Sequence, residues 1–484
     1  MVKTYDGTHV LLVNPNLMKP AVAPIGLDYL AHALRRQGYE LELLDLCFVD
    51  DPFQAIDNYF AVHQPSVICF SIRNLDDTCL FRSSFFLPPF KELLGHIRRR
   101  VTGPIILGGV GFSIMPEEIL GYCEVDYGIW GDGEESLPQF VFCWMGGGDL
   151  SQVPNLIYRR GERFRRNGRS FADLTHLGVP ARDTIDNQRY FREGGMGNIE
   201  TKRGCPMRCI YCADPLGKGR TYRLRPSRDV VDELEGLLAQ GIDHFHLCDA
   251  EFNLPEEHAR AVCQEMVRRD LGNRLRWYAY ASPVPLSDGL ATLFRQAGCA
   301  GINFGVDCGT DPMLKRTGRN FSVADLVRTG AICHRQGRVF MYDLLLGGPG
   351  ETKESIRATR ELMRRIAPHR VGAAMGVRVL PHAPLARQLL KEGPLTANPN
   401  LLGDLTQAIP FFAPVFYLSA QMGDEGPSYL TELVAGDERF FLMSPSGEGS
   451  QDYNYNDNTL LVDAIRNGYR GAYWDILRRW REAT

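Results

Sequence analysis

Short apolar runs alternate with stretches of helical spacing along the first part of the chain. The runs have the length and continuity of buried parallel strands, whereas the segments between them repeat apolar residues every three or four positions. One helical segment spans residues 24–38 and closes with a glycine. The apolar runs cover residues 9–13, 41–46, 67–71, 105–107 and 127–130. This alternation predicts an α/β fold that begins with a doubly wound, Rossmann-like domain over residues 1–144.

Residues 145–195 interrupt the alternation. Three consecutive glycines at 146–148 indicate a flexible start, and residues 155–164 have the pattern of a hairpin that turns at Gly161. This segment is predicted to be a linker that contains one hairpin.

The alternation resumes at residue 196 and continues to residue 395. Strand-like runs cover residues 199–201, 244–247, 277–280, 301–305, 339–346 and 372–380. Six such repeats predict a central partial (β/α)6 barrel, with its active site at the carboxyl ends of the strands. Residues 396–484 are expected to form an appended α/β domain that closes the barrel.

Composition and charge narrow the range of functions. With 484 residues and 44% hydrophobic content, the chain can bury several cores. A formal net charge of -4 gives no general nucleic-acid or membrane signal, and no run of 18 apolar residues suggests a membrane span. No signal peptide is recognised, so we expect a cytoplasmic enzyme with neither a nucleic-acid nor a membrane partner.

Three cysteines in one short run are the strongest chemical signal. Cys205, Cys209 and Cys212 have the spacing C-x3-C-x2-C. A four-iron cluster is normally held by four thiolates, so three leave one iron open for a small molecule. A zinc site would need a fourth ligand at short spacing, and the next candidates are His244 and His246. Disulfides are not expected, because the 13 cysteines are an odd number in a chain without a secretion signal.

This motif, with the aromatic Tyr211 just before its last cysteine, resembles the radical S-adenosylmethionine (SAM) superfamily. The resemblance implies a 4Fe-4S cluster held by Cys205, Cys209 and Cys212, with SAM bound at the open iron. It also implies reductive cleavage of SAM to a 5'-deoxyadenosyl radical, which abstracts hydrogen from a small-molecule substrate. The electron would come from an external flavodoxin-like or ferredoxin-like donor.

Later strand ends resemble further parts of the same superfamily. Residues 249–251 match its strand-end motif, residues 305–309 resemble Gly-x-Glu-Ser-Gly with Asp307 in place of Glu, and residues 346–352 resemble its glycine-rich segment. The last predicted strand resembles the side that binds adenine. The SAM contacts that this resemblance implies are Tyr211, Asp249, Glu251, Asp307, Gly347, Gly348, Gly350, Glu351 and Val379.

The N-terminal pattern resembles the cobalamin-binding Rossmann domain found ahead of many radical SAM cores. The resemblance rests on residues 107–109 followed by residues 131–134. The family's D-x-H-x-x-G signature, whose His binds cobalt, is missing from this chain. Two alternatives therefore stay open: a domain that binds cobalamin without a His ligand, and a retained scaffold that binds none.

The fate of the substrate radical follows from this choice. Without a corrinoid, the expected reaction is dehydration or a related conversion of an aminosugar or another secondary metabolite, as in the radical SAM diol dehydratases of aminoglycoside biosynthesis, which the layout resembles. With cobalamin, the chain would be a C-methyltransferase. The missing His favours dehydration as the main prediction. Candidate acids and bases for it at the barrel mouth are Glu200, Tyr278, Tyr280, Tyr342 and Asp343, with packing in the barrel interior as the alternative role.

Overall fold

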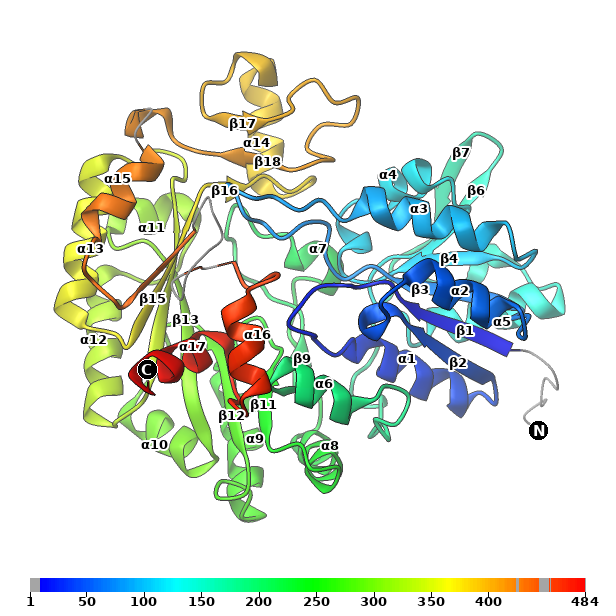
Figure 1. Ribbon diagram of the computed structural model, residues 1–484, viewed down its shortest axis with the longest axis horizontal. Coiled ribbons are helices and arrows are strands. Elements are labelled where there is room, and N and C mark those ends of the chain that lie inside the picture. The colour runs from blue at the N-terminus through cyan, green and yellow to red at the C-terminus, as the bar shows by residue number, and fades with distance from the viewer. Residues whose placement is uncertain (1–8, 424–425, 444–451, 453, 484) are drawn as a thin grey trace.

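The structure is a computed structural model that describes residues 9–423, 426–443, 452 and 454–483. It contains two seven-stranded sheets that face one another through their carboxyl edges (Figure 1). The N-terminal sheet lies in the blue and cyan part of Figure 1, and the second sheet in the green and yellow part. No helix among the described residues has both the length and the apolar character needed to cross a bilayer.

The N-terminal sheet confirms the predicted doubly wound domain. Its strands are β1 (His9–Asn14), β2 (Glu40–Asp45), β3 (Val67–Ser71), β4 (Ile105–Gly108), β5 (Tyr127–Ile129), β6 (Leu156–Arg160) and β7 (Arg163–Arg166). Their order is β2-β1-β3-β4-β5-β6-β7, in which the first five are parallel and the last two antiparallel. The hairpin predicted within the linker is thus present as β6 and β7, and it extends this sheet.

Both faces of the sheet are covered by helices, which explains why its inner strands β1, β3 and β4 are mostly apolar. Leu11 and Val13 of β1 belong to the core on one face, whereas Val10 and Leu12 belong to the core on the other. The helices are α1 (Ile25–Arg36), α2 (Pro52–Phe60), α3 (Leu87–Arg98), α4 (Pro116–Cys123) and α5 (Ser136–Gly146).

The second sheet is the predicted partial barrel, with one additional strand. Its members are β8 (Gly197–Ile199), β11 (His244–Leu247), β12 (Arg276–Ala281), β13 (Cys299–Asp307), β14 (Phe340–Leu346), β15 (Arg370–Met375) and β19 (Phe440–Leu442). All pair in parallel in the order β19-β15-β14-β13-β12-β11-β8. The additional strand β19 comes from the predicted appended domain and extends the sheet beyond β15.

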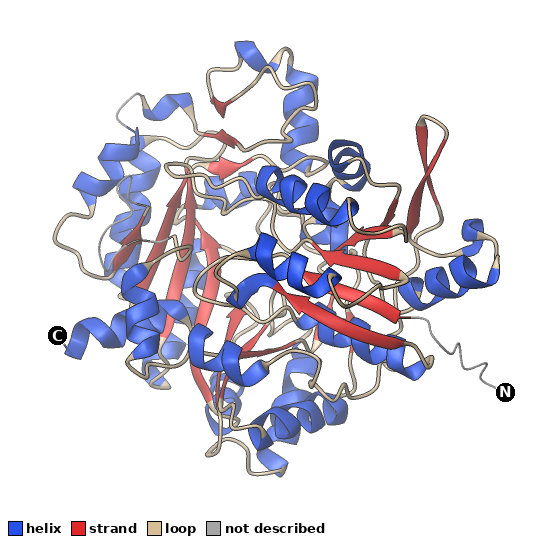
Figure 2. Cartoon of the chain, turned by 45° about the vertical axis from the view of Figure 1, so that its right-hand side comes forward, coloured by secondary structure: helices blue, strands red, loops and turns tan. Residues whose placement is uncertain are grey.

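Helices pack on the outside of this curved sheet (Figure 2). They are α8 (Ser227–Ala239), α9 (Glu256–Arg268), α10 (Asp288–Gln296), α11 (Asp311–Thr317), α12 (Val323–Arg335) and α13 (Lys353–Ile366). Three other helices lie at its margins: α6 (Asn187–Gly194) contacts β8, α7 (Asp214–Lys218) contacts residues 112–114 of the N-terminal domain, and α14 (Pro384–Glu392) packs with Val377 and Tyr417. Both α12 and α13 begin with a capping box, which satisfies the first backbone N–H groups of each helix. A two-stranded ribbon of β9 (Lys202–Arg203) and β10 (Arg223–Leu224) flanks the cysteine run.

The sixth predicted strand is divided in two. Gly376, with a φ of +83°, turns the chain after β15, so that β16 (Val377–Arg378) leaves the barrel sheet. There it pairs with β18 (Val415–Tyr417), which in turn pairs with β17 (Leu401–Gly403).

The C-terminal helices lie over the barrel. They are α15 (Gly426–Leu433), α16 (Thr459–Arg466) and α17 (Tyr473–Ala483). In Figure 1 the red α16 and α17 cross the barrel strands, and α16 packs against α6. Trp474 of α17 contacts the ring of Tyr278 in β12, with 6.2 Å between centroids.

Buried ion pairs join the two halves of the molecule. Arg182 donates to Asp28 of α1 (2.7 Å) and to Glu233 of α8 (2.6 Å), and all three side chains are almost fully buried. A second link runs from Arg378 to Asp76, at 2.8 Å. Because a charge left alone in such a place is costly, these pairs hold the halves in one arrangement.

Candidate active site

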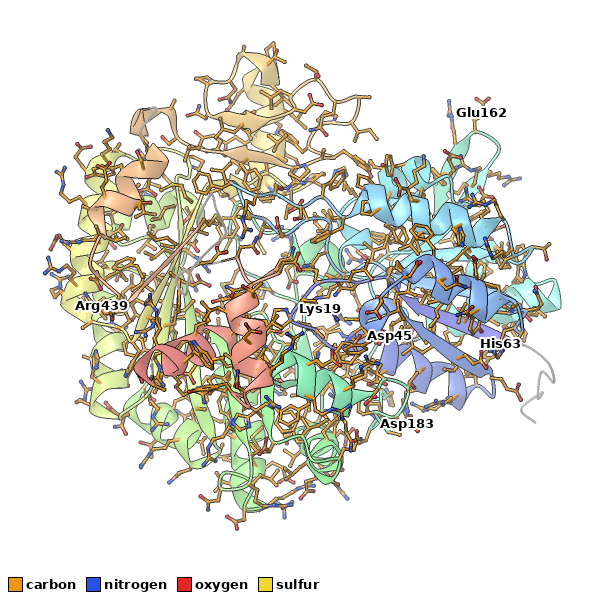
Figure 3. All side chains as sticks on the ribbon, in the orientation of Figure 1. Lys19, Asp45, His63, Glu162, Asp183 and Arg439 are labelled. Carbon is orange, nitrogen blue, oxygen red and sulfur yellow. The ribbon has the colours of Figure 1, made fainter. Side chains whose placement is uncertain are left out.

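The carboxyl ends of the two sheets surround one cavity of about 1120 Å³. Its Rossmann wall consists of the segments that follow β1, β3, β4 and β5, which is where a sheet of order 2-1-3-4-5 binds its ligands. Its barrel wall includes residues at the ends of β11 to β14, and residues 454–456 and 472–474 complete it. Lys19, which also lines the cavity, lies between the two halves in Figure 3. Both domains therefore contribute to one site.

The three predicted cluster ligands share the wall of a smaller cavity of about 130 Å³. The loop that carries them begins at Gly204, whose φ is +86° and where a Cβ would collide with the carbonyl oxygen of Thr221. Cys205, Cys209 and Cys212 all line this cavity, and none of them forms a disulfide. The loop is thus shaped so that the three thiols converge on one space.

The chemistry of these thiols fits an iron-sulfur cluster. Burial raises the pKa of Cys209 to about 11 and that of Cys212 to about 12, and it also raises the pKa of Cys205. Iron-bound cysteine is a thiolate, so metal binding has to offset this cost. Within the described part of the chain, no three His, Cys, Asp or Glu side chains are arranged to hold a single metal ion. A four-iron cluster differs because each thiolate binds its own iron, and thiols spread around one cavity suit it.

The two acidic residues after β11 have different surroundings. Asp249 is buried and accepts hydrogen bonds from the backbone N–H groups of Thr201 (2.9 Å) and Lys202 (3.2 Å) and from the Thr201 hydroxyl (2.5 Å). Glu251 lines the cysteine cavity, its Oε2 has no hydrogen-bond partner, and burial raises its pKa to about 7. Asp249 therefore stabilises the backbone of the strand before the cysteines. Glu251 has an oxygen available for the SAM amino group or for the open iron.

Asp307 links the barrel to the cysteine loop. Arg319 donates two hydrogen bonds to its carboxylate (2.7 and 2.8 Å), and the hydroxyl of Tyr211 donates to it at 2.9 Å. The direction of the Asp307 side chain is set by a register shift in β13 and by the backbone φ of Asp307, which is +67°. A positive φ is uncommon in residues other than glycine. Since Tyr211 and Arg319 line both cavities, the three residues form the partition between them.

Two predicted barrel-mouth residues offer reactive groups to the large cavity. Tyr280 lines it beside His246, with 5.0 Å between the ring centroids, and burial together with the charge of Asp343 raises the Tyr280 pKa to about 12. The carboxylate of Asp343 accepts a hydrogen bond from Asn303 at 3.2 Å, and both residues line the cavity. The buried Oδ1 of Asn303 has no hydrogen-bond partner. This part of the wall can therefore donate to and accept from a polar ligand.

Two more predicted residues line the cavity but already have partners. The hydroxyl of Tyr278 donates to Asp475 of α17 at 2.8 Å. Glu200 accepts a hydrogen bond from Arg203 at 2.7 Å. Their contacts tie the cavity wall to the C-terminal helix and to the cysteine loop.

Tyr342 points away from the cavity. Its side chain is fully buried in the barrel core, and its hydroxyl donates to the backbone oxygen of Leu326 at 2.7 Å. Successive strand residues point to opposite faces, so Tyr342 faces the helices while its neighbour Asp343 faces the cavity. A catalytic role predicted for Tyr342 has no support in this placement.

The glycine-rich segment and the last strand lie behind the cavity walls. A Cβ at Gly347 would meet Leu418 at 2.6 Å, and Glu351 is buried and accepts a hydrogen bond from Ser355 in the first turn of α13. Val379 belongs to a hydrophobic cluster, whereas the residues on either side of it line the cavity. Neither cavity is lined by Gly347, Gly348, Gly350, Glu351 or Val379, so SAM contacts there remain predictions.

The Rossmann side of the cavity suits a corrinoid without a His ligand. Among the described residues that line the cavity, the one histidine is His246, which belongs to the barrel. Arg73, at the end of β3, has a buried Nη1 without a hydrogen-bond partner. Glycines 108, 109 and 131 line the same part of the cavity, and a Cβ at Gly109 would collide with the backbone of Ile72. Cobalamin carries amide and phosphate acceptors, so this donor and this backbone surface could hold it.

Three basic residues at the site were missed by the sequence analysis. Lys202 and Arg203 directly precede the cysteine run, and their place in the chain was a usable signal. Arg319 is far along the chain, near the start of the loop after α11, and nothing in the sequence indicates that it reaches Asp307 and the cysteine cavity.

Comparison with known proteins identifies the family. The sequence profile of the Radical SAM superfamily matches residues 199–363, and the profile of the B12 binding domain matches residues 18–141. The chain belongs to the radical SAM superfamily and carries a B12-binding domain. The chain is therefore an enzyme of a class that uses a 4Fe-4S cluster and SAM. Its B12-binding domain supports cobalamin as a further cofactor.

Full-length relatives are methyltransferases. The radical SAM methyltransferase TsrM from Kitasatospora setae, solved with tryptophan substrate and a SAM analogue, is 31% identical over 98% of this chain and 99% of its own, with a TM-score of 0.92. The tryptophan 2-C-methyltransferase of Streptomyces laurentii is 29% identical over 98% of this chain and 96% of its own. The cobalamin-dependent enzyme OxsB shares the fold, with a TM-score of 0.70 at 19% identity over 88% of this chain and 66% of its own.

These relatives change the expected reaction. They support the methyltransferase alternative, and the main prediction of dehydration receives no support from them. That prediction relied on the missing D-x-H-x-x-G signature, yet residues 18–141 match the B12-binding domain without it. The missing histidine therefore does not indicate that the domain lost its cofactor. The tryptophan-bound relative also agrees with a small-molecule substrate.

Proposed function

We propose that this enzyme is a cobalamin-dependent methyltransferase that moves a methyl group from SAM to a carbon atom of a small aromatic substrate, tryptophan or a close analogue. The observation that carries the proposal is the single cavity where the cysteine loop, the B12-binding domain and the barrel mouth meet. Group transfer among three bound molecules requires that they share one space. The full-length similarity to tryptophan methyltransferases supports the same reaction.

The cysteine loop would hold the iron-sulfur cluster through Cys205, Cys209 and Cys212, with Glu251 on the remaining side of the same cavity. When bound, the cluster supplies an electron and the corrinoid carries a methyl group, chemistry that no side chain provides. The chain itself binds, orients and shields. Asp307 contributes by fixing Tyr211 and Arg319 between the cluster side and the substrate side.

The substrate would lie on an aromatic part of the cavity wall. Tyr280, Tyr455, Tyr473 and Trp474 all line this region, and such rings stack on an indole or a similar ring system. With its pKa raised to about 12, the Tyr280 hydroxyl stays protonated at neutral pH and acts as a donor. The Asp343 carboxylate offers an acceptor to a substrate N–H group. Such contacts at both ends of a ring system would present one carbon to the corrinoid.

The C-terminal helix would help to exclude water from this region. Tyr278 and Asp475 join the barrel wall to α17 through a buried hydrogen bond of 2.8 Å. A dry site protects reactive species from solvent. The electron would be delivered by an external low-potential protein of the flavodoxin or ferredoxin type.

Labelled SAM tests the proposal. The protein, reconstituted anaerobically with iron, sulfide and hydroxocobalamin, is incubated with dithionite as the reductant, tryptophan and SAM that carries a deuterated methyl group. The expected product is tryptophan with a deuterated methyl group on carbon, formed only when cobalamin is present. Unmethylated tryptophan after incubation would refute this substrate, and a dehydrated product or methyl transfer without cobalamin would refute the reaction type.

A further inference from the structure

Lys202 is a buried cation beside the cysteine loop. It lies in β9, three positions before Cys205, and its side chain is 2% exposed. Its Nζ has no hydrogen-bond acceptor among the described residues. The nearest defined contact of the ammonium is with a ring face, because Nζ lies 5.3 Å from the centroid of Tyr222. An ammonium buried without an acceptor is costly, so an anionic partner is expected when the site is filled.

The backbone around Lys202 is held firmly. Asp249 accepts hydrogen bonds from the N–H groups of Thr201 and Lys202, at 2.9 and 3.2 Å. Lys202 also pairs with Leu224 across the β9–β10 ribbon. These bonds fix the strand that carries the Lys202 side chain beside the cysteine run.

Two other polar atoms without partners accompany it. The Tyr222 hydroxyl and Oε2 of Glu251 are both buried and lack hydrogen bonds. Lys202 itself belongs to the β9–β10 ribbon that flanks the cysteine run, and only two residues separate it from Cys205.

We propose that the Lys202 ammonium donates a hydrogen bond to the cluster at the Cys205 corner, to the cysteine sulfur or to an adjacent sulfide, and so raises the reduction potential of the cluster. This rests on the proposed function only in that Cys205, Cys209 and Cys212 bind a 4Fe-4S cluster. Reduction adds one electron, delivered by an external low-potential donor, and neither forms nor breaks a bond. A fixed positive charge stabilises the added negative charge, and hydrogen bonds to cluster sulfurs are an established means of tuning such potentials.

A redox titration followed by electron paramagnetic resonance tests the inference. It uses reconstituted full-length protein without SAM, cobalamin or substrate, so that the cluster alone is measured. Lys202→Met should lower the ratio of reduced to oxidised cluster about tenfold at a fixed potential, a shift of about 59 mV to lower potential for one electron. Lys202→Arg keeps the charge and should remain close to the wild type. Tyr222→Phe removes the neighbouring hydroxyl without changing charge and should leave the potential unchanged.

Two outcomes would overturn the inference. An unchanged potential in Lys202→Met would show that the ammonium does not act on the cluster. Failure of the wild-type chain to bind a four-iron cluster would overturn the proposed function as well, so the two failures are distinguishable.

A second measurement is made on the wild-type protein, with Lys202→Arg as its control. Wild-type protein grown with lysine labelled at the side-chain nitrogen should show magnetic coupling between that nitrogen and the reduced cluster in pulsed resonance spectra. The signal should disappear in Lys202→Arg, which removes the label from this position. Absence of the coupling in the wild type would contradict the proposed hydrogen bond.

Discussion

Arg203 donates a hydrogen bond of 2.6 Å to Glu134, although the two residues belong to different domains. Arg203 lies two positions before Cys205, and Glu134 lies in the loop after β5 of the B12-binding domain. The same guanidinium donates to Glu200 at 2.7 Å and lies 3.2 Å from Asp132. One buried side chain therefore fixes the cysteine loop relative to the loop after β5 of the B12-binding domain.

Removing this guanidinium should destabilise the protein. Arg203→Met leaves Glu134 and Glu200 without their ion-pair partner, whereas Asp132 keeps Arg223. Breaking such a buried group costs on the order of 3 kcal/mol. Denaturant unfolding monitored by fluorescence should show this loss. Arg189→Met is the matched control, because Arg189 forms an exposed helical pair with Glu193 that contributes at most about 0.5 kcal/mol. Equal stability of the two variants would contradict the role given to Arg203.

Each of the three cluster cysteines should be required for iron binding. Alanine at position 205, 209 or 212 leaves two thiolates around the small cavity, too few to hold a four-iron cluster that is open at one iron. Iron and sulfide analysis after reconstitution should show loss of the cluster, together with loss of methyl transfer. Cys143→Ala, in α5 of the B12-binding domain, should retain the full iron content. Turnover by any of the three loop variants would refute the ligand assignment.

Substitutions at two neighbouring residues of β14 should have different effects on activity and on stability. Asp343→Asn alters a cavity group and should lower kcat/KM by about 10²-fold, while the contents of iron and corrinoid stay unchanged. Tyr342→Phe removes a core hydrogen bond to Leu326 and should lower the free energy of unfolding by about 1 kcal/mol with little effect on kcat/KM. Steady-state kinetics and unfolding of both variants check this contrast. Similar kinetic losses in the two would contradict the assignment of faces.

Stability should depend on pH through His246. Burial lowers the pKa of this side chain from 6.5 to about 4. Between these values the unfolded chain binds a proton that the folded protein does not, so this residue makes stability fall as the pH drops from about 6.5 to about 4. His246→Phe should reduce the slope of unfolding free energy against pH in that window, when compared with the wild type in the same cofactor state. An unchanged slope would mean that the imidazole is not shielded as the structure indicates.

Local patterns in the sequence carry much of this fold. Buried parallel strands are continuous apolar runs, so most strands of both sheets could be located from the sequence. The cysteine loop could be located from the spacing of its three cysteines. The position of β19 could not, because a three-residue strand joins the barrel only through pairing with β15, distant in the chain. Likewise, the division of the last barrel strand at Gly376 depends on the pairing of β16 with β18.

Individual site contacts were harder to predict than the motif. Asp249 and Glu251 are two residues apart and chemically alike, yet one is occupied by backbone donors and the other retains a free oxygen. Tyr342 and Asp343 differ only in the strand face they occupy, which depends on register. Arg319 reaches Asp307 through a loop whose path the sequence does not reveal. The missing cobalt-binding histidine favoured dehydration, because a sequence motif reports the presence of a ligand residue. The shape of the cavity that could hold a corrinoid cannot be read from such a motif.

Binding of a corrinoid by the B12-binding domain, next to the cysteine loop, can be measured with an absorbance spectrum. Protein reconstituted with iron and sulfide is incubated with hydroxocobalamin and passed through a desalting column under anaerobic conditions. We expect about one corrinoid per chain, retained with the protein and identified by its visible bands. Elution of all the corrinoid in the small-molecule fraction, from protein with a full iron complement, would contradict it.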